Sequence, residues 1–349
     1  MQFFFLDQVL SYLSGNIGID LGTANTPVYV KGKGMQLNEP SYVAIDNVSG
    51  KVVAVGARAK EMHGRAPGHI SVIRPLRDGV IANFEIAYQM LKYFLGKVSS
   101  LKNSIPPRVI VGVPSDVTPV ERRAVSEATV CAGARKAYLV EQPLAAAIGA
   151  DLPVVEPVGS MIVDIGAGTT EIAVIALGGI VVSHSLRVAG DEMDEAIVYY
   201  LRKMRNLLVG ERTAERIKIA IAGIDPEARV LEMQVRGRDL LTGLPRSILT
   251  NTGEIRESLL EIARSIVDGV KMTLEETPPE LLSDILARGI VLAGGGGLLR
   301  GLPEVIGRAT GVPVRLAPDP LFAVLNGAGK LLDSPSLLRQ TVLRENHRW

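Results

Sequence analysis

Alternating apolar and polar positions, together with short apolar runs, predict β-strands joined by glycine-rich turns in two parts of the chain. Residues 18–34, GIDLGTANTPVYVKGKG, have the pattern of a strand, a tight turn and a second strand. Residues 163–180, VDIGAGTTEIAVIALGGI, repeat that pattern. The two segments align from Asp20 to Thr26 and from Asp164 to Thr170, so the sequence predicts the same hairpin twice.

Helical periodicity marks other segments of the chain. Residues 120–134, VERRAVSEATVCAGA, place apolar side chains on one stripe of a helix, so we expect Cys131 to pack in the core. Residues 253–286 have the pattern of helices broken at Pro278 and Pro279, because proline lacks the N–H that a helix interior uses. The stripe consists of Val120, Ala124, Val125, Ala128 and Cys131.

The first fourteen residues, MQFFFLDQVLSYLS, form an amphipathic segment ahead of the first strand. They lack the positive region and the small-residue cleavage site of a secretory signal, so we expect them to be retained. The pattern fits a helix on a membrane surface or a helix docked on the protein itself, and its breadth favours the membrane. The apolar face holds Phe3, Phe5, Leu6, Val9, Leu10, Tyr12 and Leu13, and the polar face Asp7, Gln8, Ser11 and Ser14.

Composition narrows the class of protein. The chain has 349 residues, 47% of them hydrophobic, which suffices for about two domains. Its 38 Lys and Arg residues nearly balance 37 Asp and Glu residues, so no long-range field attracts nucleic acid. One cysteine and four scattered histidines predict a reduced cytosolic protein without a transition-metal site. No apolar run approaches the roughly 20 residues of a membrane-spanning helix.

The turns of the paired hairpins are suited to binding an anion. Glycine frees a row of backbone N–H groups in each turn, and threonine hydroxyls flank them. Asp20 and Asp164 stand at the bases of the turns, where two carboxylates facing one phosphate require a cation between them. The sequence therefore predicts Mg²⁺, bound through water, with nucleotide phosphates beyond it. It contains neither a P-loop nor a G-x-G-x-x-G fingerprint.

A third glycine cluster lies in residues 289–303, GIVLAGGGGLLRGLP, between an expected buried strand and a helix. Backbone without side chains can approach a flat ligand closely, so Gly294 to Gly297 are candidates to line an adenosine. A tight turn between strand and helix is the alternative explanation. Four consecutive glycines exceed what such a turn needs, which favours the ligand.

Taken in order, these hairpins and the segments VEQPLAAAIGA, GDEMDEAI, GERTAERIK, TGLPR and LAGGGGLLRGLP resemble the bacterial actin MreB family from about residue 16 to residue 333. The resemblance implies an α/β actin-like ATPase fold, in which two related ribonuclease H-like halves surround a nucleotide cleft. Each half carries a small insert. The implied subdomains are IA (15–43, 77–156 and 324–349), IB (44–76), IIA (157–192 and 255–323) and IIB (193–254), after a membrane-binding helix at 1–14.

The resemblance also assigns roles to residues. Adenosine would meet Gly294, Gly295, Gly296 and Gly297, while the AERIK segment would approach the purine and ribose. Without the resemblance, AERIK is a solvated amphipathic helix with i,i+3 charge pairing. The implied catalytic residues are Gln142, Glu141 and Asp164, with Mg²⁺ at Asp20 and Asp164. The phosphate loops would be Gly22, Thr23, Ala24 and Asn25, and Gly166, Ala167, Gly168 and Thr169, and the AERIK contacts Glu215, Arg216, Ile217 and Lys218.

Three departures from the family pattern bear on catalysis. Gln142 stands where the family usually has glutamate; glutamine orients water but cannot take its proton, so we expect slow hydrolysis, with Glu141 a possible compensating group. Ala167 replaces a glycine, at a cost of roughly 1 kcal/mol if that position needs a positive φ. Pro27 removes a donor, so its strand should be locally unpaired there.

The resemblance implies a membrane-associated cytoskeletal ATPase that uses ATP and Mg²⁺ and forms filaments with itself. Such a protein lies on the inner face of the cytoplasmic membrane and organises cell-wall synthesis and rod shape, with membrane proteins of the elongation machinery as partners. The alternatives are a nucleotide-bound scaffold without hydrolysis and a small-molecule kinase, for which the inserts are short. Leu101 and Ile105, in the loop 96–108, fit a second membrane contact and a plain surface loop equally well.

Overall fold

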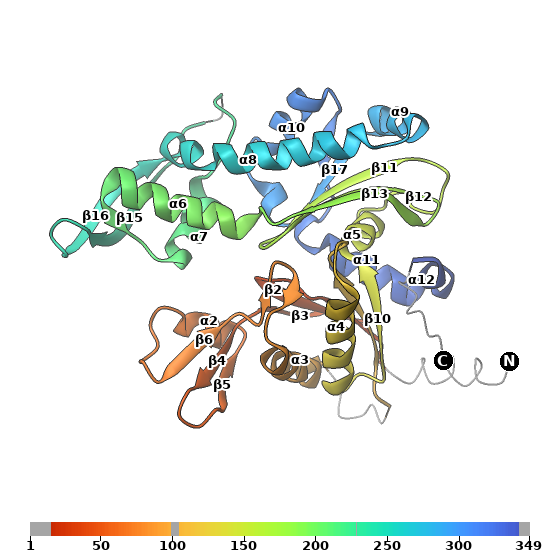
Figure 1. Ribbon diagram of the computed structural model, residues 1–349, viewed down its shortest axis with the longest axis horizontal. Coiled ribbons are helices and arrows are strands. Elements are labelled where there is room, and N and C mark those ends of the chain that lie inside the picture. The colour runs from red at the N-terminus through yellow and green to blue at the C-terminus, as the bar shows by residue number, and fades with distance from the viewer. Residues whose placement is uncertain (1–14, 99–104, 228, 342–349) are drawn as a thin grey trace. The chain divides into compact units, whose positions relative to one another are not determined.

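The computed structural model describes residues 15–98, 105–227 and 229–341, and the chain divides into two compact units (Figure 1). The first unit takes in residues 1–158, 175–181 and 322–349, and the second takes in 159–174 and 182–321. No helix in the described ranges is long and apolar enough to cross a membrane. The segment 1–14 and Leu101 lie outside the described residues, so the expectations for them stay predictions.

A five-stranded sheet in the order β10-β9-β1-β2-β3 forms the centre of the first unit. Strands β1, β9 and β10 are parallel, and β2 and β3 continue from β1 as an antiparallel meander. The first predicted hairpin is therefore present as β1 and β2. The strands are β1 (Ile17–Asp20), β2 (Asn25–Val30), β3 (Gly34–Pro40), β9 (Arg108–Val113) and β10 (Lys136–Glu141).

Helices cover both faces of this sheet, as its buried parallel strands require. Ile17, Ile19 and Val111 point to one face and pack in a core with α3 and α4. On the other face Gly18 is in contact with α11, because a β-carbon at this position would lie 3.0 Å from that of Ala328. The helices are α3 (Phe84–Val98), α4 (Pro119–Cys131), α5 (Gln142–Gly149), α11 (Ala323–Asp333) and α12 (Pro335–Thr341).

Helices α5 and α11 cross with their backbones in contact. A β-carbon added at Gly149 would lie 1.8 Å from the carbonyl oxygen of Ala323, and one at Gly327 would lie 1.8 Å from that of Ala145. Only glycine therefore fits at either position. Lys330 of α11 donates to the last carbonyl oxygens of α5, which completes the end of that helix. The crossing fixes α5, whose first residue is Gln142, against the sheet.

The expected packing of Cys131 is wrong, because this cysteine is exposed. Helix α4 begins at Pro119 after a capping box and buries Val125, Ala128 and Thr129. Ala132, immediately after the helix, is also buried. The buried stripe thus includes the position after Cys131, and one residue is a rotation of about 100° on a helix.

Smaller elements complete the first unit. A three-stranded sheet in the order β5-β4-β6 carries helix α2 within the first insert. The carboxylate of Glu39 accepts from the N–H of Ala57 at the start of α2 and from Lys97 at the end of α3, so it ties the insert to the main sheet. The elements are β4 (Val43–Asp46), β5 (Val52–Val55), α2 (Ala57–Met62), β6 (Ile70–Ile73), β7 (Leu76–Arg77) and β8 (Val80–Ile81).

The second unit repeats the sheet plan of the first. Its order is β13-β12-β11-β17-β18, in which β11, β17 and β18 are parallel and β12 and β13 follow β11 in the chain. The second predicted hairpin is therefore present as β11 and β12. The strands are β11 (Ser160–Ile165), β12 (Thr170–Ala176), β13 (Gly179–Leu186), β17 (Ile290–Ala293) and β18 (Val314–Leu316).

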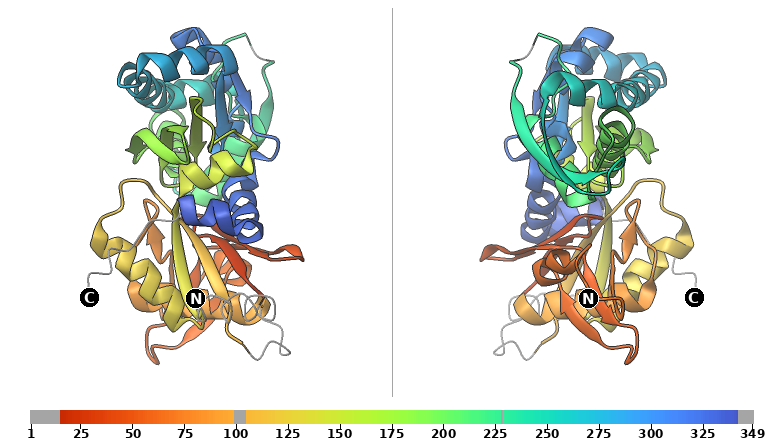
Figure 2. Two further views of the ribbon diagram at one scale, coloured as in Figure 1. Left: turned by 90° about the vertical axis from the view of Figure 1, so that its right-hand side faces the viewer. Right: turned by 90° about the vertical axis from the view of Figure 1, so that its left-hand side faces the viewer.

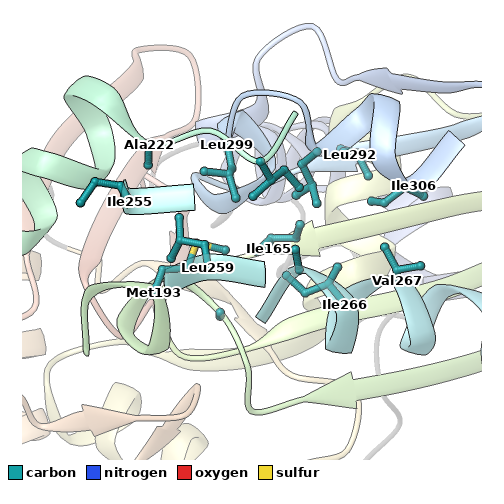
Figure 3. Packing of buried hydrophobic residues seen from close by; sticks show 14 of the residues in the cluster. Ile165, Met193, Ala222, Ile255, Leu259, Ile266, Val267, Leu292, Leu299 and Ile306 are labelled. Carbon is teal, nitrogen blue, oxygen red and sulfur yellow. The ribbon is translucent and has the colours of Figure 1, made fainter. Parts of the chain in front are cut away.

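A single hydrophobic core joins this sheet to its helices (Figure 3). Ile255, Leu259 and Ile266 recur at helical spacing on one face of α8 and meet Ile165 and Leu292 of the strands. The long helical segment is broken at Pro278 and Pro279, as predicted. The elements are α6 (Gly190–Arg205), α7 (Glu211–Ile221), α8 (Thr252–Glu275), α9 (Pro279–Arg288) and α10 (Leu302–Thr310), with 3₁₀ turns η1 (Gly296–Leu298) and η2 (Pro320–Phe322).

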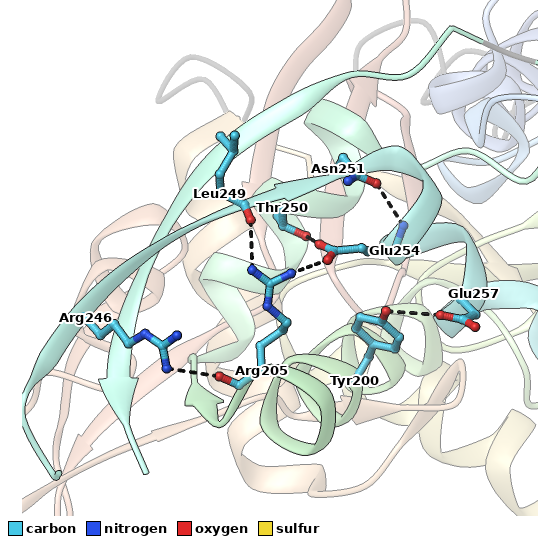
Figure 4. A network of polar contacts seen from close by, with 8 residues as sticks. All are labelled: Tyr200, Arg205, Arg246, Leu249, Thr250, Asn251, Glu254 and Glu257. Carbon is cyan, nitrogen blue, oxygen red and sulfur yellow. Dashed lines mark hydrogen bonds and ion pairs between the residues drawn. The ribbon is translucent and has the colours of Figure 1, made fainter. Parts of the chain in front are cut away.

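The second insert is fixed to its helices by a polar network (Figure 4). Arg205 at the end of α6 forms an ion pair with Glu254 of α8 and donates to the carbonyl oxygen of Leu249. The hydroxyl of Thr250 donates to the same carboxylate, and Arg246 donates to the carbonyl oxygen of Arg205. The insert forms a sheet of β14 (Leu207–Leu208), β15 (Glu232–Asp239) and β16 (Pro245–Asn251), which Figure 2 shows from two further sides.

Candidate functional site

In the first unit, Asp20 and Gln142 meet at the carboxyl edge of the sheet. Asp20 ends β1 and pairs with Gly112 of β9, while Gln142 begins α5 immediately after β10. The side-chain amide of Gln142 donates to the Asp20 carboxylate at 3.3 Å. A β-carbon at Gly112 would lie 3.3 Å from Cγ of Gln142, so glycine leaves room beside this pair. Glu141, the last residue of β10, adjoins it.

The environment of Asp20 favours its neutral form. Burial raises the pKa of Asp20 to about 6, and the hydrogen bond from Gln142 opposes this shift. A cation at the carboxylate would restore the ionised form, and carboxylate oxygen is a ligand that Mg²⁺ prefers. Asp20 thus has the chemistry of a metal ligand.

The first turn is held from behind by Ser41. The Ser41 hydroxyl donates to the carbonyl oxygen of Gly22 at 2.6 Å, and the Ser41 N–H donates to that of Ala24 at 2.9 Å. Because a trans peptide points its C=O and N–H in opposite directions, the N–H groups of Thr23 and Asn25 are turned to the other side. A β-carbon at Gly22 would lie 2.5 Å from the carbonyl oxygen of Asn25, so the turn requires glycine.

Two side chains of the first hairpin have internal roles. The hydroxyl of Thr23 accepts from the N–H of Gly79 at 3.0 Å, so this threonine also fixes the turn to its own unit. The registered pairs between β1 and β2 end at Ile19 with Val28, so Pro27, the next residue toward the turn, has no partner on β1. That ending agrees with the expectation of a local loss of pairing, while Pro27 still lies opposite Asn38 of β3.

The second turn is held by the first turn of helix α6. The N–H of Gly190 donates to the carbonyl oxygen of Gly166 at 3.2 Å, and the N–H of Asp191 donates to that of Ala167 at 2.7 Å. By the same peptide geometry, the N–H groups of Ala167 and Gly168 point the other way. Each unit therefore directs two backbone donors away from its anchored carbonyls. The N–H of Gly166 donates to Thr169 within the turn.

Ala167 does not have the backbone conformation that would penalise a methyl group. In the described ranges, positive φ occurs outside glycine at Asp78, Asp151, Leu177 and Asn206. The condition for the expected cost is therefore not met. The methyl group of Ala167 is therefore accommodated without the penalty of a positive φ.

The third glycine cluster joins the second hairpin at the edge of its sheet. Asp164 pairs with Ala293, the last residue of β17, and Gly294 follows with φ +75°. A β-carbon at Gly294 would lie 2.6 Å from a carboxylate oxygen of Asp164, and one at Gly296 would lie 2.3 Å from the Ile165 side chain. Packing within the unit thus explains two of the four glycines. A β-carbon at Gly295 or Gly297 would meet only ordinary contacts; Gly295 is exposed and Gly297 is buried.

The AERIK segment forms part of α7, but its side chains have separate roles. Ile217 is buried in the core, so a ligand contact there would have to involve backbone. Arg216 is exposed and Glu215 is half-buried. Lys218 donates to the carbonyl oxygen of Gly190 at 2.6 Å and to Asp194 at 2.9 Å. The ammonium of Lys218, on α7, is thus bound to two groups of α6.

Sequence patterns gave no indication of two residues that matter to these turns. Ser41 is one serine in a polar stretch after β3, and no motif distinguishes it. Asp194 lies in the acidic run GDEMDE, where nothing in the sequence distinguishes it from the neighbouring acidic residues. Their contacts depend on how separate elements pack.

Comparisons with known proteins agree with these features. The model of the MreB/Mbl protein family matches residues 14–340. The cell shape-determining protein Mbl of Bacillus subtilis is 49% identical over 91% of this chain and 96% of its own length. The cell shape-determining protein MreB of Escherichia coli is 53% identical over 92% and 94%, respectively.

Solved structures extend the likeness to the fold. MreB5 of Spiroplasma citri bound to AMPPNP superposes with a TM-score of 0.87 and 37% identity, over 91% of this chain and 96% of that one. A MamK double helical filament gives a TM-score of 0.76 at 25% identity, over 91% and 98%. The actin-like α/β fold with two related halves, predicted from the sequence, is confirmed.

Proposed function

The chain belongs to the MreB/Mbl family, and from this premise we propose that it is an ATP-binding, filament-forming protein that determines cell shape from the inner face of the cytoplasmic membrane. The relatives at about half identity are named for cell shape, and the relative from Spiroplasma citri was solved with AMPPNP and with ADP. ATP and Mg²⁺ are the proposed ligands.

The observation that supports nucleotide binding is the anchoring of both turns through their carbonyl oxygens. It directs the N–H groups of Thr23, Asn25, Ala167 and Gly168 away from the anchors, and such donors bind phosphate oxygens. In this proposal both turns bind the phosphates of one ATP. Asp20 and Asp164 hold Mg²⁺ through water, and Gly294 to Gly297, with Glu215, bind the adenosine.

Hydrolysis in this proposal is slow. Mg²⁺, when bound, offsets charge on the phosphates, and Gln142 orients the attacking water without accepting its proton. The hydrogen bond from Gln142 to Asp20 supports a second candidate, a nucleotide-bound scaffold that does not hydrolyse, because it shows the amide occupied as a donor. Phosphate release from the ATP-bound protein separates the two.

Polymerisation and membrane attachment complete the proposal. Copies of the chain stack into filaments, as MamK does, and residues 1–14 attach them to the membrane. The proposed subdomains of each copy are two in the first half and two in the second. They are IA (15–43, 77–156 and 324–349), IB (44–76), IIA (157–192 and 255–323) and IIB (193–254). Membrane proteins of the cell-wall elongation machinery are the proposed partners.

Electron microscopy of purified protein on anionic vesicles with ATP and Mg²⁺ tests this proposal. The full chain should form filaments flat on the lipid, and the chain lacking residues 1–14 should form few there. A variant with Phe3, Leu6 and Leu10 replaced by serine keeps the length of the segment and should behave like the deletion. If the full chain binds ATP and yet forms no polymer with or without lipid, the cytoskeletal function is wrong.

A further inference from the structure

The partly buried ion pair between Lys218 and Asp194 lies behind the second phosphate turn. The two side chains come from α7 and α6, which pack together, and are only 19% and 13% exposed. Lys218 also donates to the carbonyl oxygen of Gly190, in the first turn of α6. The same Gly190 donates its N–H to Gly166 of the phosphate turn. Two hydrogen bonds therefore connect the Lys218 ammonium to the turn.

The space around Gly190 makes this connection tight. A β-carbon at Gly190 would lie 3.1 Å from the carbonyl oxygen of Gly166 and 3.3 Å from Nζ of Lys218. The helix end is thus packed between the phosphate turn on one side and the ammonium on the other. The N-cap residue Ala189 has no side-chain acceptor, and the Glu192 carboxylate accepts from the Ala189 N–H at 2.8 Å, so Glu192, Lys218 and the turn together fix this end of α6.

Asp194 depends on Lys218 for its charge. One of its oxygens accepts from Lys218, and the other is buried without a hydrogen-bond partner in the described part of the chain. Burial raises the pKa of Asp194 to about 6, while Lys218 opposes the shift and the neighbouring Glu215 and Asp191 add to it. Removing the ammonium alone would leave a buried carboxylate uncompensated.

We propose that Lys218 and Asp194 are positioning residues that hold the second phosphate turn through the first turn of α6, and that Lys218 is not a contact to the adenosine. This inference rests on the proposed ATP site and assigns a different task to one residue of it. The ammonium acts through Gly190 on Gly166 and Ala167, so its effect reaches the phosphates and not the base.

Binding of adenosine, ADP and ATP to the full-length protein and its Lys218→Met variant tests the assignment. The variant should lose about tenfold in affinity for ADP and ATP and keep its affinity for adenosine. Equal losses for all three ligands would mean that Lys218 contacts the adenosine, which overturns the proposal. Lys203→Met, on the exposed part of α6, is the matched control and should leave all three affinities unchanged.

A double-mutant cycle supplies the second readout. Asp194→Asn removes the charge that Lys218 compensates, so Asp194→Asn with Lys218→Met should bind ATP better than Lys218→Met alone. Additive losses would contradict the coupling. If the unmodified protein binds none of the ligands, the proposed ATP site is wrong. Hydrogen exchange without nucleotide then tests the positioning alone. The backbone amides of residues 166–169 should exchange faster in Lys218→Met than in the unmodified protein.

Discussion

The two hairpins share one plan and differ in what holds their turns. Each has an aspartate at its base, a glycine two residues later, and two carbonyl oxygens that accept hydrogen bonds from a following segment. In the first unit, one residue at the bend after β3, Ser41, supplies both donors. In the second, two N–H groups at the start of α6 supply them, with Lys218 behind. The same turn can thus depend on one side chain or on a helix end.

Gly112 and Gly294 are comparable positions, because each lies next to an aspartate on a neighbouring strand. Their substitutions to alanine should produce the largest difference in unfolding free energy between the units. At Gly294 a methyl group meets backbone at 2.2 Å with a positive φ, whereas at Gly112 the nearest atom is a Val324 methyl at 3.0 Å. We expect losses in unfolding free energy of about 3–5 and about 1 kcal/mol. Urea denaturation measures both, and equal losses would contradict the contrast.

Gly22→Ala and Gly166→Ala compare the turns themselves. A β-carbon would meet the carbonyl oxygen three residues later at 2.5 Å in the first turn and at 3.2 Å in the second. Gly22→Ala should therefore cost about 2 kcal/mol of stability and Gly166→Ala less than about 1 kcal/mol. ATP binding should fall in the same order. A larger effect at Gly166 would show that the helix end makes the second turn the more rigid of the two.

Ser41→Ala examines the single-residue anchor. It removes the donor to Gly22 and leaves the buried hydroxyl of Thr26 without this partner. The expected loss in unfolding free energy is about 1–2 kcal/mol, together with weaker ATP binding. Ser41→Thr, which keeps the hydroxyl, is the control. Unchanged ATP affinity in Ser41→Ala would mean that the backbone N–H of residue 41 suffices.

The smallest effect that we expect is a pH dependence of stability and of Mg²⁺ binding that comes from Asp20 alone. Its pKa of about 6 lies above the ordinary value, so its neutral form is favoured on folding and its contribution to stability rises as pH falls through 6. Mg²⁺ binding needs the ionised form and should weaken over the same range, by about tenfold per pH unit below 6.

Asp194 has a raised pKa as well, so the useful measurement is the difference between the unmodified protein and Asp20→Asn. The variant should bind Mg²⁺–ATP weakly at all pH values and lose the part of the pH dependence that Asp20 supplies. If the pH dependence of Asp20→Asn matches that of the unmodified protein, the titrating group lies elsewhere.

The duplicated hairpins were predictable because their signal is local. Asp20 and Asp164 end strands whose apolar runs and glycine turns are visible in sequence, and Gly294 follows a third such strand. The broken helix at Pro278 was predictable for the same reason.

What the sequence could not show depends on packing between distant segments. Cys131 lies at a helix end, where one residue of rotation decides between burial and exposure. The hydrogen bond that holds the carbonyl oxygen of Ala167 comes from Asp191 of α6, 24 residues later in the chain. Lys218 also has an acidic residue on its own helix at a spacing that allows pairing. Its partner is Asp194 because α6 and α7 pack together, which the sequence does not show.

The crossing of α5 and α11 has a consequence for how the protein forms during synthesis. Helix α11 belongs to the first unit but is the last long helix to be made, after the whole of residues 182–321. At about 5–20 residues per second, the nascent first unit waits on the order of ten seconds for it. During that time the sheet lacks the cover that α11 gives to β1, β2 and β9. A ribosome-bound chain is thus most prone to aggregation in the interval after the early part of the first unit has been made and before α11 has been made. Chaperones have most to protect during that interval.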